Sequence, residues 1–307
     1  MSQSEQTGRV IASFGRHIVV EDSAGEQRIC HPKGKKNEAV VGDWVRWQAS
    51  GDEGRIVGVQ ARNNLLFHQD EWRTKMFAAN LDQVLVFLGA TPEFSERQLT
   101  RALIACEAAH IPVTIVLNKH DLREAFDRAW ARLQPYANMG YDLMALSLSD
   151  EAPHGVEAIT QLLQHRVSLI LGPSGAGKSS LINRCIPHAQ VLTQQISQAL
   201  NSGKHTTTTT TWHWLNAAKD AALIDSPGFQ EFGLNHIELT QLAALMPDVA
   251  AHTGHCKYYN CTHRQEPGCG VRAAVDRASE PGQKPLIERR YQLYQELYEE
   301  LDQAPRY

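Results

Sequence analysis

A glycine-rich segment in the middle of the chain carries the clearest chemistry in the sequence. It follows an apolar run at 167–171 and reads Gly172-Pro173-Ser174-Gly175-Ala176-Gly177-Lys178-Ser179-Ser180. In this pattern the glycines let the backbone turn its N–H groups toward phosphate oxygens, and the helix that follows adds its positive N-terminus. We expect Lys178 to contact the β- and γ-phosphates and the Ser179 hydroxyl to bind Mg²⁺. The segment predicts a nucleoside triphosphate site.

A second polar segment, Asn118-Lys119-His120-Asp121, follows the apolar run at 113–117. Loops after such strands bind ligands in α/β sheets. The aspartate can accept hydrogen bonds from N1–H and the exocyclic amine of guanine, whereas adenine would turn a lone pair toward it. Leaving a buried group unpaired in this way can cost a factor of about 10⁴ in selectivity. The four residues together predict a site for GTP and GDP.

Two other interpretations of these segments stay open from the residues alone. Asp121 could be only the cap of a helix, and the glycine-rich loop could then belong to a kinase or an ATPase. Competition between GTP and ATP for binding separates those enzymes from a guanine-nucleotide protein. The presence of both segments in one chain favours the guanine-nucleotide interpretation.

A third segment, Asp225-Ser226-Pro227-Gly228, also follows a short apolar run. Beside a triphosphate, Asp225 would hold Mg²⁺ through a water molecule, and the backbone N–H of Gly228 would contact the γ-phosphate. The polar run at 203–211, which is rich in threonine, precedes this segment. We expect one of its threonines, Thr207, to bind Mg²⁺ together with Ser179.

The order of these segments is unusual. Ordinary GTPases present the phosphate loop first and the base-reading tetrad last, but here residues 118–121 precede residues 172–179. The same sheet must therefore be traversed from a different starting strand, which is a circular permutation. The segment Ser147-Leu148-Ser149, after the apolar run at 143–146, falls where a secondary base-binding loop is expected.

A cluster of cysteines and histidine lies near the C-terminus. Three of the six cysteines fall in the pattern Cys256-x4-Cys261-x-His263-x5-Cys269. Three thiolates and an imidazole are enough for a closed tetrahedral Zn²⁺ site, which predicts a structural role. His252 and His255 are nearby alternatives to His263.

These motifs require particular elements to position them. Nearly continuous apolar runs at 82–88, 111–117, 167–171 and 221–224 predict a parallel α/β sheet, with crossover helices at 96–110 and 122–134. Short β-rich runs between Gly8 and Gln60 predict a small β-barrel, with a basic turn at 31–36 that would suit RNA or simply face solvent. Beyond Gly233 the sequence predicts helices, ending with one at 287–301.

Composition limits the class of protein. At 307 residues, 42% hydrophobic and 21% charged, the chain predicts a globular protein of two or three domains. No run is long enough for a membrane helix and no signal peptide is evident, so we expect a cytoplasmic protein without membrane contact. The net charge of −4 means that any RNA contact must come from local patches.

With these motifs in place, the chain resembles the circularly permuted, ribosome-small-subunit-dependent GTPases of bacteria. The resemblance implies a multidomain protein: an N-terminal OB-fold that binds RNA (1–65), a circularly permuted P-loop α/β GTPase domain (66–235), and a C-terminal helical zinc-binding domain (236–307). It also implies the partner, which is the small ribosomal subunit with its 16S rRNA. The implied activity is GTP hydrolysis late in subunit maturation. The zinc motif of the family matches Cys256, Cys261, His263 and Cys269, and we expect a monomer.

The residue that activates water is less evident. Phe229 stands directly after the Asp-x-x-Gly turn, where many GTPases have a glutamine, and a phenyl ring cannot orient water. His205 matches the switch histidine of the family and is the candidate catalytic residue, with Gln230 second. The alternative is a non-catalytic, guanine-nucleotide-gated RNA-binding factor, which single-turnover GTP cleavage would distinguish.

Overall fold

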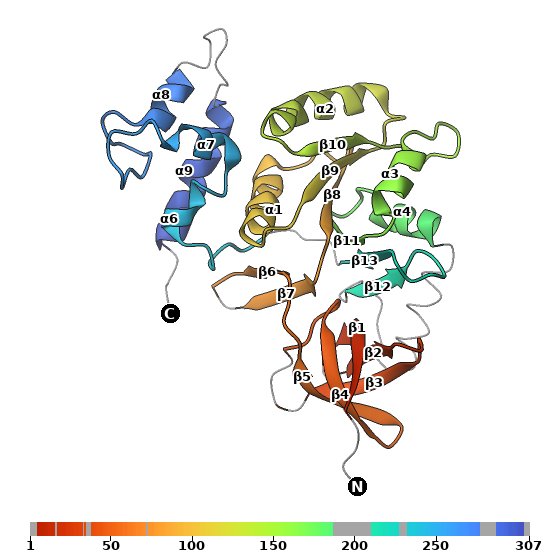
Figure 1. Ribbon diagram of the computed structural model, residues 1–307. Helices are drawn as coiled ribbons and strands as arrows, with labels where there is room; N and C mark the ends of the chain where they lie inside the picture. The colour runs from red at the N-terminus through yellow and green to blue at the C-terminus, as the bar shows by residue number, and fades with distance from the viewer. Residues whose placement is uncertain are drawn as a thin grey trace.

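The computed structural model of the chain describes residues 5–15, 17–32, 34, 38–71, 73–186, 210–226, 232–276 and 287–303. These residues form a small barrel, then an α/β sheet with helices on both faces, then a helical region (Figure 1). Three residues of the expected site, His205, Thr207 and Gly228, lie outside the described residues, as do Phe229 and Gln230.

Five strands near the N-terminus close into a barrel. They pair in the order β1-β2-β3-β5-β4, and β1 also pairs with β4. Residues such as Val10, Ile18 and Trp47 fill the interior, because successive side chains of a strand point to opposite faces. The strands are β1 (Gln6–Phe14), β2 (His17–Asp22), β3 (Gln27–Pro32), β4 (Trp44–Ser50) and β5 (Glu53–Val59).

The third strand differs from the sequence-based expectation. His31 and Pro32, expected to begin the basic turn, instead end β3 and pair in parallel with Arg55 and Ile56 of β5. The partner strand lies more than twenty positions away in the chain, so the local sequence of the turn does not reveal this pairing.

The central sheet has six strands in the order β10-β9-β8-β11-β13-β12. The first five are mutually parallel, as the apolar runs predicted, but β12 is antiparallel to β13 and forms the edge next to the barrel. A short turn joins β12 to β13, which is why the two strands run in opposite directions. The strands are β8 (Gln83–Gly89), β9 (Val113–Asn118), β10 (Asp142–Ala145), β11 (Val167–Leu171), β12 (Thr211–Trp214) and β13 (Ala222–Asp225).

Two pairs of helices cover the sheet. Side chains of α1 (Glu96–Ala108) and α2 (Arg123–Asn138) pack in one core with Val84 and Val86 of β8. Those of α3 (Val156–Leu163) and α4 (Lys178–Cys185) pack in another, with Leu85 and Phe87. All seven residues of β8 are buried, as expected for a strand covered on both faces.

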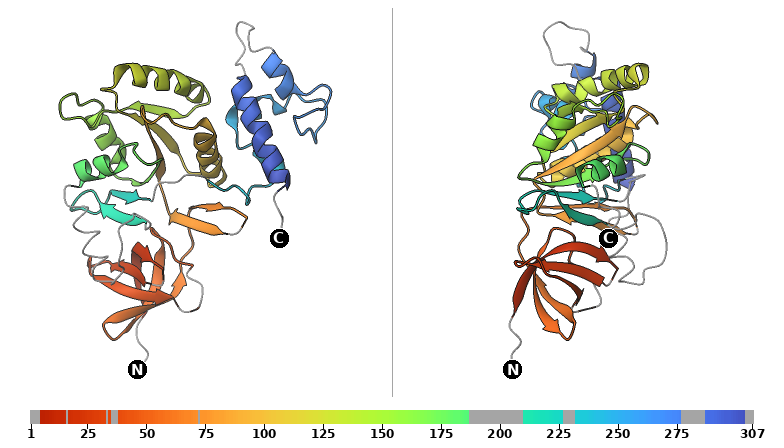
Figure 2. Two further views of the ribbon diagram at one scale, coloured as in Figure 1. Left: turned by 180° about the vertical axis from the view of Figure 1, so that it is seen from behind. Right: turned by 90° about the vertical axis from the view of Figure 1, so that its right-hand side faces the viewer.

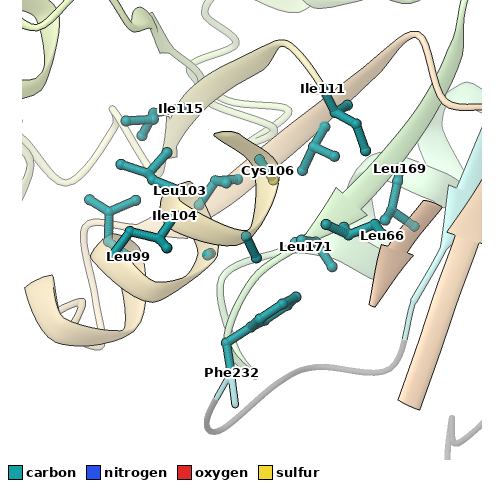
Figure 3. Packing of buried hydrophobic residues seen from close by; sticks show 14 of the residues in the cluster. Leu66, Leu99, Leu103, Ile104, Cys106, Ile111, Ile115, Leu169, Leu171 and Phe232 are labelled. Atoms are coloured by element: carbon teal, nitrogen blue, oxygen red, sulfur yellow. The ribbon is translucent and has the colours of Figure 1, made fainter. Parts of the chain in front are cut away.

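A hairpin that the sequence did not indicate lies between the barrel and the sheet (Figure 1). It consists of β6 (Leu65–Gln69) and β7 (Thr74–Ala79). Leu66 of the hairpin is fully buried and lies near α1 and Phe232, as Figure 3 shows. The ring of Phe77 stacks on that of Phe232 with centroids 5.2 Å apart. The hairpin therefore anchors the segment that begins at Phe232.

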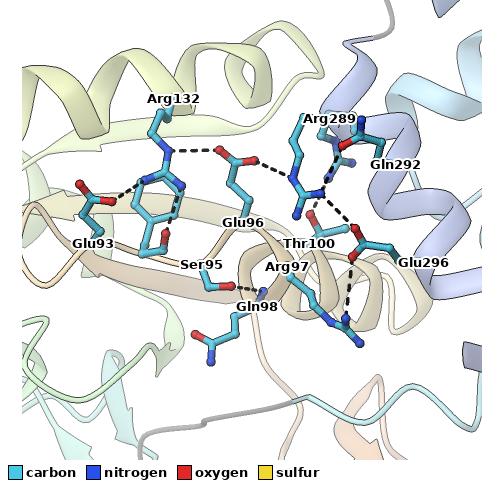
Figure 4. A network of polar contacts seen from close by, with 12 residues as sticks. Glu93, Ser95, Glu96, Arg97, Gln98, Thr100, Arg132, Arg289, Gln292 and Glu296 are labelled. Atoms are coloured by element: carbon cyan, nitrogen blue, oxygen red, sulfur yellow. Dashed lines mark hydrogen bonds and ion pairs between the residues drawn. The ribbon is translucent and has the colours of Figure 1, made fainter.

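The C-terminal helices are joined to the sheet through α1. They are α6 (Leu239–Leu242), α7 (Pro247–Thr253), α8 (Gly270–Asp276) and α9 (Glu288–Gln303), and Figures 1 and 2 both place α9 beside α1. The buried Arg101 of α1 binds both carboxylate oxygens of Glu300, at 2.7 and 2.8 Å. Arg97, Glu96 and Arg289 extend this polar network (Figure 4). Among the described residues, no helix is long and apolar enough to span a membrane.

Candidate functional site

The loops that follow β9, β11 and β13 surround a cavity of about 730 Å³. The three strands are parallel, so their carboxyl ends meet at one edge of the sheet, where α/β proteins bind ligands. The expected nucleotide-binding residues that line the cavity are Asn118, Lys119, Asp121, Ser174, Gly175, Gly177, Lys178, Ser179, Ser180 and Asp225. The structure thus brings the base-reading and phosphate segments to one pocket.

The phosphate loop depends on its glycines. Gly177 has φ of 104°, and a Cβ there would lie 2.3 Å from Nδ2 of Asn118. A side chain at Gly172 would collide with the carbonyl oxygen of Phe87. Nζ of Lys178 donates hydrogen bonds to the carbonyl oxygens of Gly172 and Pro173, at 2.8 and 2.9 Å. The lysine therefore lies folded over its own loop, at the place where phosphates would be bound.

The base-reading segment is bonded to the phosphate loop. Asn118 is buried, and its Nδ2 donates to the carbonyl oxygen of Ala176 at 3.0 Å. Its Oδ1 is buried without a hydrogen-bond partner among the described residues, which fits a polar ligand at this place. Oδ1 of Asp121 accepts a hydrogen bond of 2.8 Å from the hydroxyl of the fully buried Ser147. Ser147 therefore orients the carboxylate that would read guanine.

Asp225 and Ser226 complete the pocket on the side of β13. Burial raises the pKa of Asp225 to about 6, although nearby Lys178 lowers it. Burial likewise lowers the pKa of Lys178, against the effect of Asp225. The hydroxyl of Ser226 donates to the carbonyl oxygen of Ile170 at 2.6 Å, and a threonine at this position would also supply a hydroxyl.

Several expected residues support the pocket without lining it. His120 turns aside and stacks on His154, with ring centroids 4.1 Å apart. Gly172, Pro173, Ala176 and Ser147 act through the bonds described above. Thr211, expected to end the polar run, is instead buried in β12.

Leu148 and Ser149 of the expected secondary base-binding loop and Ser226 of the third segment also line the pocket. Sequence reasoning did not assign Leu122, which lines it as well; its only sequence signal is that it directly follows Asp121.

Cys256, Cys261, His263 and Cys269 lie together in the C-terminal region, with ligand atoms all within 4.8 Å of one another. Nδ1 of His263 is 3.4 Å from Sγ of Cys256 and 3.6 Å from Sγ of Cys269. The alternatives His252 and His255 are not part of this group. Three sulfur donors and one nitrogen donor suit a tetrahedral metal ion with no open position.

Contacts outside the four residues hold their loop in place. The hydroxyl of Tyr291 in α9 donates to the carbonyl oxygen of His263 at 2.7 Å, and that of Tyr294 to Thr262 at 3.0 Å. Burial and the neighbouring thiols raise the pKa of Cys261 to about 12. A bound cation would reverse this shift and favour the thiolates, so the donors fit a metal such as Zn²⁺.

The fold and pocket define a class of protein. The base-reading segment at 118–121 and the phosphate loop at 172–179 line one pocket, yet the base-reading segment comes first along the chain. Such a protein is a circularly permuted GTPase.

Comparison with known proteins identifies the family. The sequence model of the RsgA GTPase family matches residues 59–235. The small ribosomal subunit biogenesis GTPase RsgA of Variovorax paradoxus is 59% identical over 297 residues, which cover 97% of this chain and 93% of that protein. The protein of that name from Bordetella pertussis is 46% identical over 301 residues and 98% of each chain. This chain belongs to the RsgA GTPase family, as the resemblance predicted.

Two solved structures are similar over nearly their whole length. YloQ, described as a circularly permuted GTPase, gives a TM-score of 0.68 at 27% identity and covers 99% of this chain and 98% of its own. YjeQ from Thermotoga maritima gives a TM-score of 0.72 at 26% identity, with coverage of 98% and 100%. The similarity includes the barrel and the C-terminal region as well as the GTPase sheet.

Proposed function

We propose that this protein binds the small (30S) ribosomal subunit and hydrolyses GTP to GDP and phosphate during late maturation of that subunit. The main support for this proposal is that the base-reading segment and the phosphate loop line the same pocket, where Asn118 is hydrogen-bonded to Ala176 of the loop. The names of the relatives support the partner, since they are called small ribosomal subunit biogenesis GTPases. A partner in the small subunit also supports the cytoplasm as the place of action.

Within the pocket we assign GTP with Mg²⁺. Ser179 and Asp225 both line the cavity. Ser179, together with Thr207, would bind the ion directly, and Asp225 would hold it through a water molecule. When bound, Mg²⁺ offsets the charge on the triphosphate. Asp121 would orient the guanine base, and Lys178 would exchange its loop carbonyl partners for phosphate oxygens. In the C-terminal region, Cys256, Cys261, His263 and Cys269 would hold one structural Zn²⁺.

The three parts receive separate roles in this proposal. Residues 1–65 would form an OB-fold domain that contacts 16S rRNA. The strand order of the barrel supports this assignment. Residues 66–235 would form the GTPase domain and residues 236–307 the zinc domain. The protein would act as a monomer that binds and leaves the particle.

His205 is the proposed catalytic residue. We expect His205→Ala to keep GTP affinity and to lose turnover stimulated by the particle, because an imidazole can orient water where Phe229 cannot. Unchanged stimulated turnover would exclude this role.

The function is tested by measuring GTP hydrolysis with purified small subunits, with large subunits, and in buffer. We expect strong stimulation by small subunits only, and Lys178→Ala provides the control for contaminating GTPases. Equal rates in the three conditions contradict the proposal. Single-turnover cleavage that stays absent with small subunits would favour a non-catalytic, nucleotide-gated factor.

A further inference from the structure

Strand β12 connects the barrel to the nucleotide pocket. Its first residue, Thr211, pairs on one side with Ala12 of β1 and on the other with Asp225 of β13. The next residue, Trp212, pairs with Ile224. Asp225 lines the nucleotide cavity, so β12 lies one strand away from the chemistry and one strand away from the barrel (Figure 1).

Few backbone pairs join β12 to the barrel. β12 has four residues, and its register with β1 consists of the single pair Ala12 and Thr211. By comparison, β1 pairs with β2 at six positions. Side chains must therefore supply much of what holds β12 against the barrel.

Arg9 of β1 supplies the main side-chain contact. Its guanidinium carbon lies 4.5 Å from the ring centroid of Trp44 in the barrel and 4.5 Å from that of Trp212 in β12. The ring of Trp214 is 5.9 Å away. A guanidinium within about 6 Å of an indole ring is attracted by its π-electrons, and tryptophan is the strongest partner of this kind. Arg9 thus bridges an aromatic ring of the barrel and one of the strand.

A second contact acts in the same direction. Glu21 of β2 is buried and accepts hydrogen bonds from Nε1 of Trp214 at 2.9 Å and from Nζ of Lys219 at 2.8 Å. Both donors belong to β12 or the turn after it. Two neighbouring barrel strands therefore hold two tryptophans of β12, and a displacement of the barrel would pull on this strand.

We propose that Arg9 is a positioning residue for GTP hydrolysis. Through Trp212 and β12, Arg9 couples the position of the barrel to the position of Asp225. Binding of the barrel to the small subunit would then fix β12 and, with it, the Asp225 carboxylate, which would hold Mg²⁺ through water. This rests on the proposed function, in which the particle stimulates hydrolysis. Without the particle the barrel is held only by contacts within the chain and is not fixed by a partner, so loss of the coupling has little effect on the basal rate.

The first test compares Arg9→Ala with Arg46→Ala. Arg46 lies on the neighbouring strand β4, is half-exposed, and pairs with Glu5 rather than with a tryptophan. We expect Arg9→Ala to lower the ratio of stimulated to basal kcat at saturating small subunits about tenfold or more. GDP affinity and subunit affinity should stay within about threefold, and Arg46→Ala should keep the ratio.

Further variants guard against misfolding and against a purely structural role. Arg9→Lys keeps the cation and should restore most of the ratio. Trp212→Phe keeps an aromatic ring but a weaker one, and should lower the ratio about two- to fivefold. Combining Trp212→Phe with Arg9→Ala should add nothing to the loss from Arg9→Ala, because both act on one contact.

Two results would overturn the inference. A folded Arg9→Ala protein with an unchanged ratio excludes the coupling. A fall in subunit affinity that matches the fall in turnover makes Arg9 an RNA contact instead.

Hydrogen exchange on the isolated protein separates this inference from the proposed function. A non-hydrolysable GTP analogue, compared with GDP, should change protection of β1 in the wild type but not in Arg9→Ala. If the analogue changes protection of β1 in the wild type but not in Arg9→Ala, and small subunits still fail to stimulate hydrolysis, the coupling stands and the proposed function is wrong. If β1 does not respond in the wild type, the coupling is wrong.

Discussion

The nucleotide pocket and the cysteine-histidine cluster are both built on loops, but different forces give them their shape. The pocket loops are tied together by hydrogen bonds within the protein, such as Asn118 to Ala176 and Ser147 to Asp121. These bonds require no ligand. The pocket can therefore keep its form whether or not a nucleotide is bound.

The cluster instead brings together four side chains that gain little from one another. Its donor atoms lie within 4.8 Å, and burial with neighbouring thiols raises the pKa of Cys261. Tyr291 and Tyr294 hold the backbone of the loop but do not bind the donor atoms. The difference teaches that a preformed site selects its ligand, whereas a site of crowded donors depends on its ligand for stability.

Loss of the metal should have the largest effect on the cluster and little effect on the pocket. We expect Cys261→Ser to lose the bound Zn²⁺ and to unfold the region of α7 and α8, because structural zinc contributes about 10–16 kcal/mol. GDP affinity should stay within about threefold. Metal analysis, circular dichroism and GDP titration test this, with Cys185→Ser, outside the cluster, as the control that keeps the metal. Loss of GDP binding would show that the two sites are not independent.

A side chain in the phosphate loop should break the pocket. We expect Gly177→Ala to weaken GDP binding about 100-fold or more, because Gly177 has a left-handed backbone conformation and a Cβ there would collide with the side chain of Asn118. Gly140→Ala is the matched control, since Gly140 has φ of 102° and nothing within 4 Å of its Cβ. That variant should cost about 1 kcal/mol of stability and leave GDP affinity unchanged. Similar GDP affinities for both variants would refute a preformed loop.

The charge of Asp225 should lower the stability of the fold. Its pKa is about 6 in the folded protein against 3.8 ordinarily, so the folded state binds the proton more tightly. Stability relative to a neutral side chain must then fall as pH rises from about 4 to about 6 and stay lower above that. We expect Asp225→Asn to be more stable by about 1–3 kcal/mol at pH 7.5, with little difference near pH 4. Urea unfolding at the two pH values measures this, and a pH-independent difference would contradict it.

Removal of the hydroxyl that orients Asp121 should have the smallest effect. We expect Ser147→Ala to weaken GDP binding about 3- to 10-fold, since a net hydrogen bond contributes about 0.5–1.5 kcal/mol. Preference for GDP over inosine diphosphate should also fall, because the carboxylate is less well oriented. Thr160→Ala, which removes an exposed hydroxyl from α3, is the control. An unchanged preference would mean that Asp121 needs no support.

The sequence predicted the parts of the site that depend on local chemistry. Gly177, Lys178 and Asp121 could be predicted to line one pocket, because each motif follows a buried strand and strand ends bind ligands. The grouping of Cys256 with Cys269 followed from spacing in the same way. Circular permutation was also evident, since it depends only on the order of the motifs.

Contacts between distant segments could not be predicted. The antiparallel pairing of β12 with Ala12 joins residues about 200 positions apart, and no local pattern in a four-residue strand reveals it. The bond from Arg101 to the carbonyl oxygen of Phe232 and the hairpin β6–β7 are similar cases. Their energy comes from tertiary packing, which overrides short-range preference.

Ribosomes must make β8, β9 and β10 well before β11, the strand that inserts between β8 and β13. Until then, one edge of the apolar strand β8 has no partner in the nascent chain. From Gly89 to Val167 is 167 − 89 = 78 positions, so at 5–20 residues per second the wait is roughly 4–16 s. An unpaired apolar edge is a site for aggregation, and the permuted gene order thus lengthens the time for which this chain needs protection by chaperones.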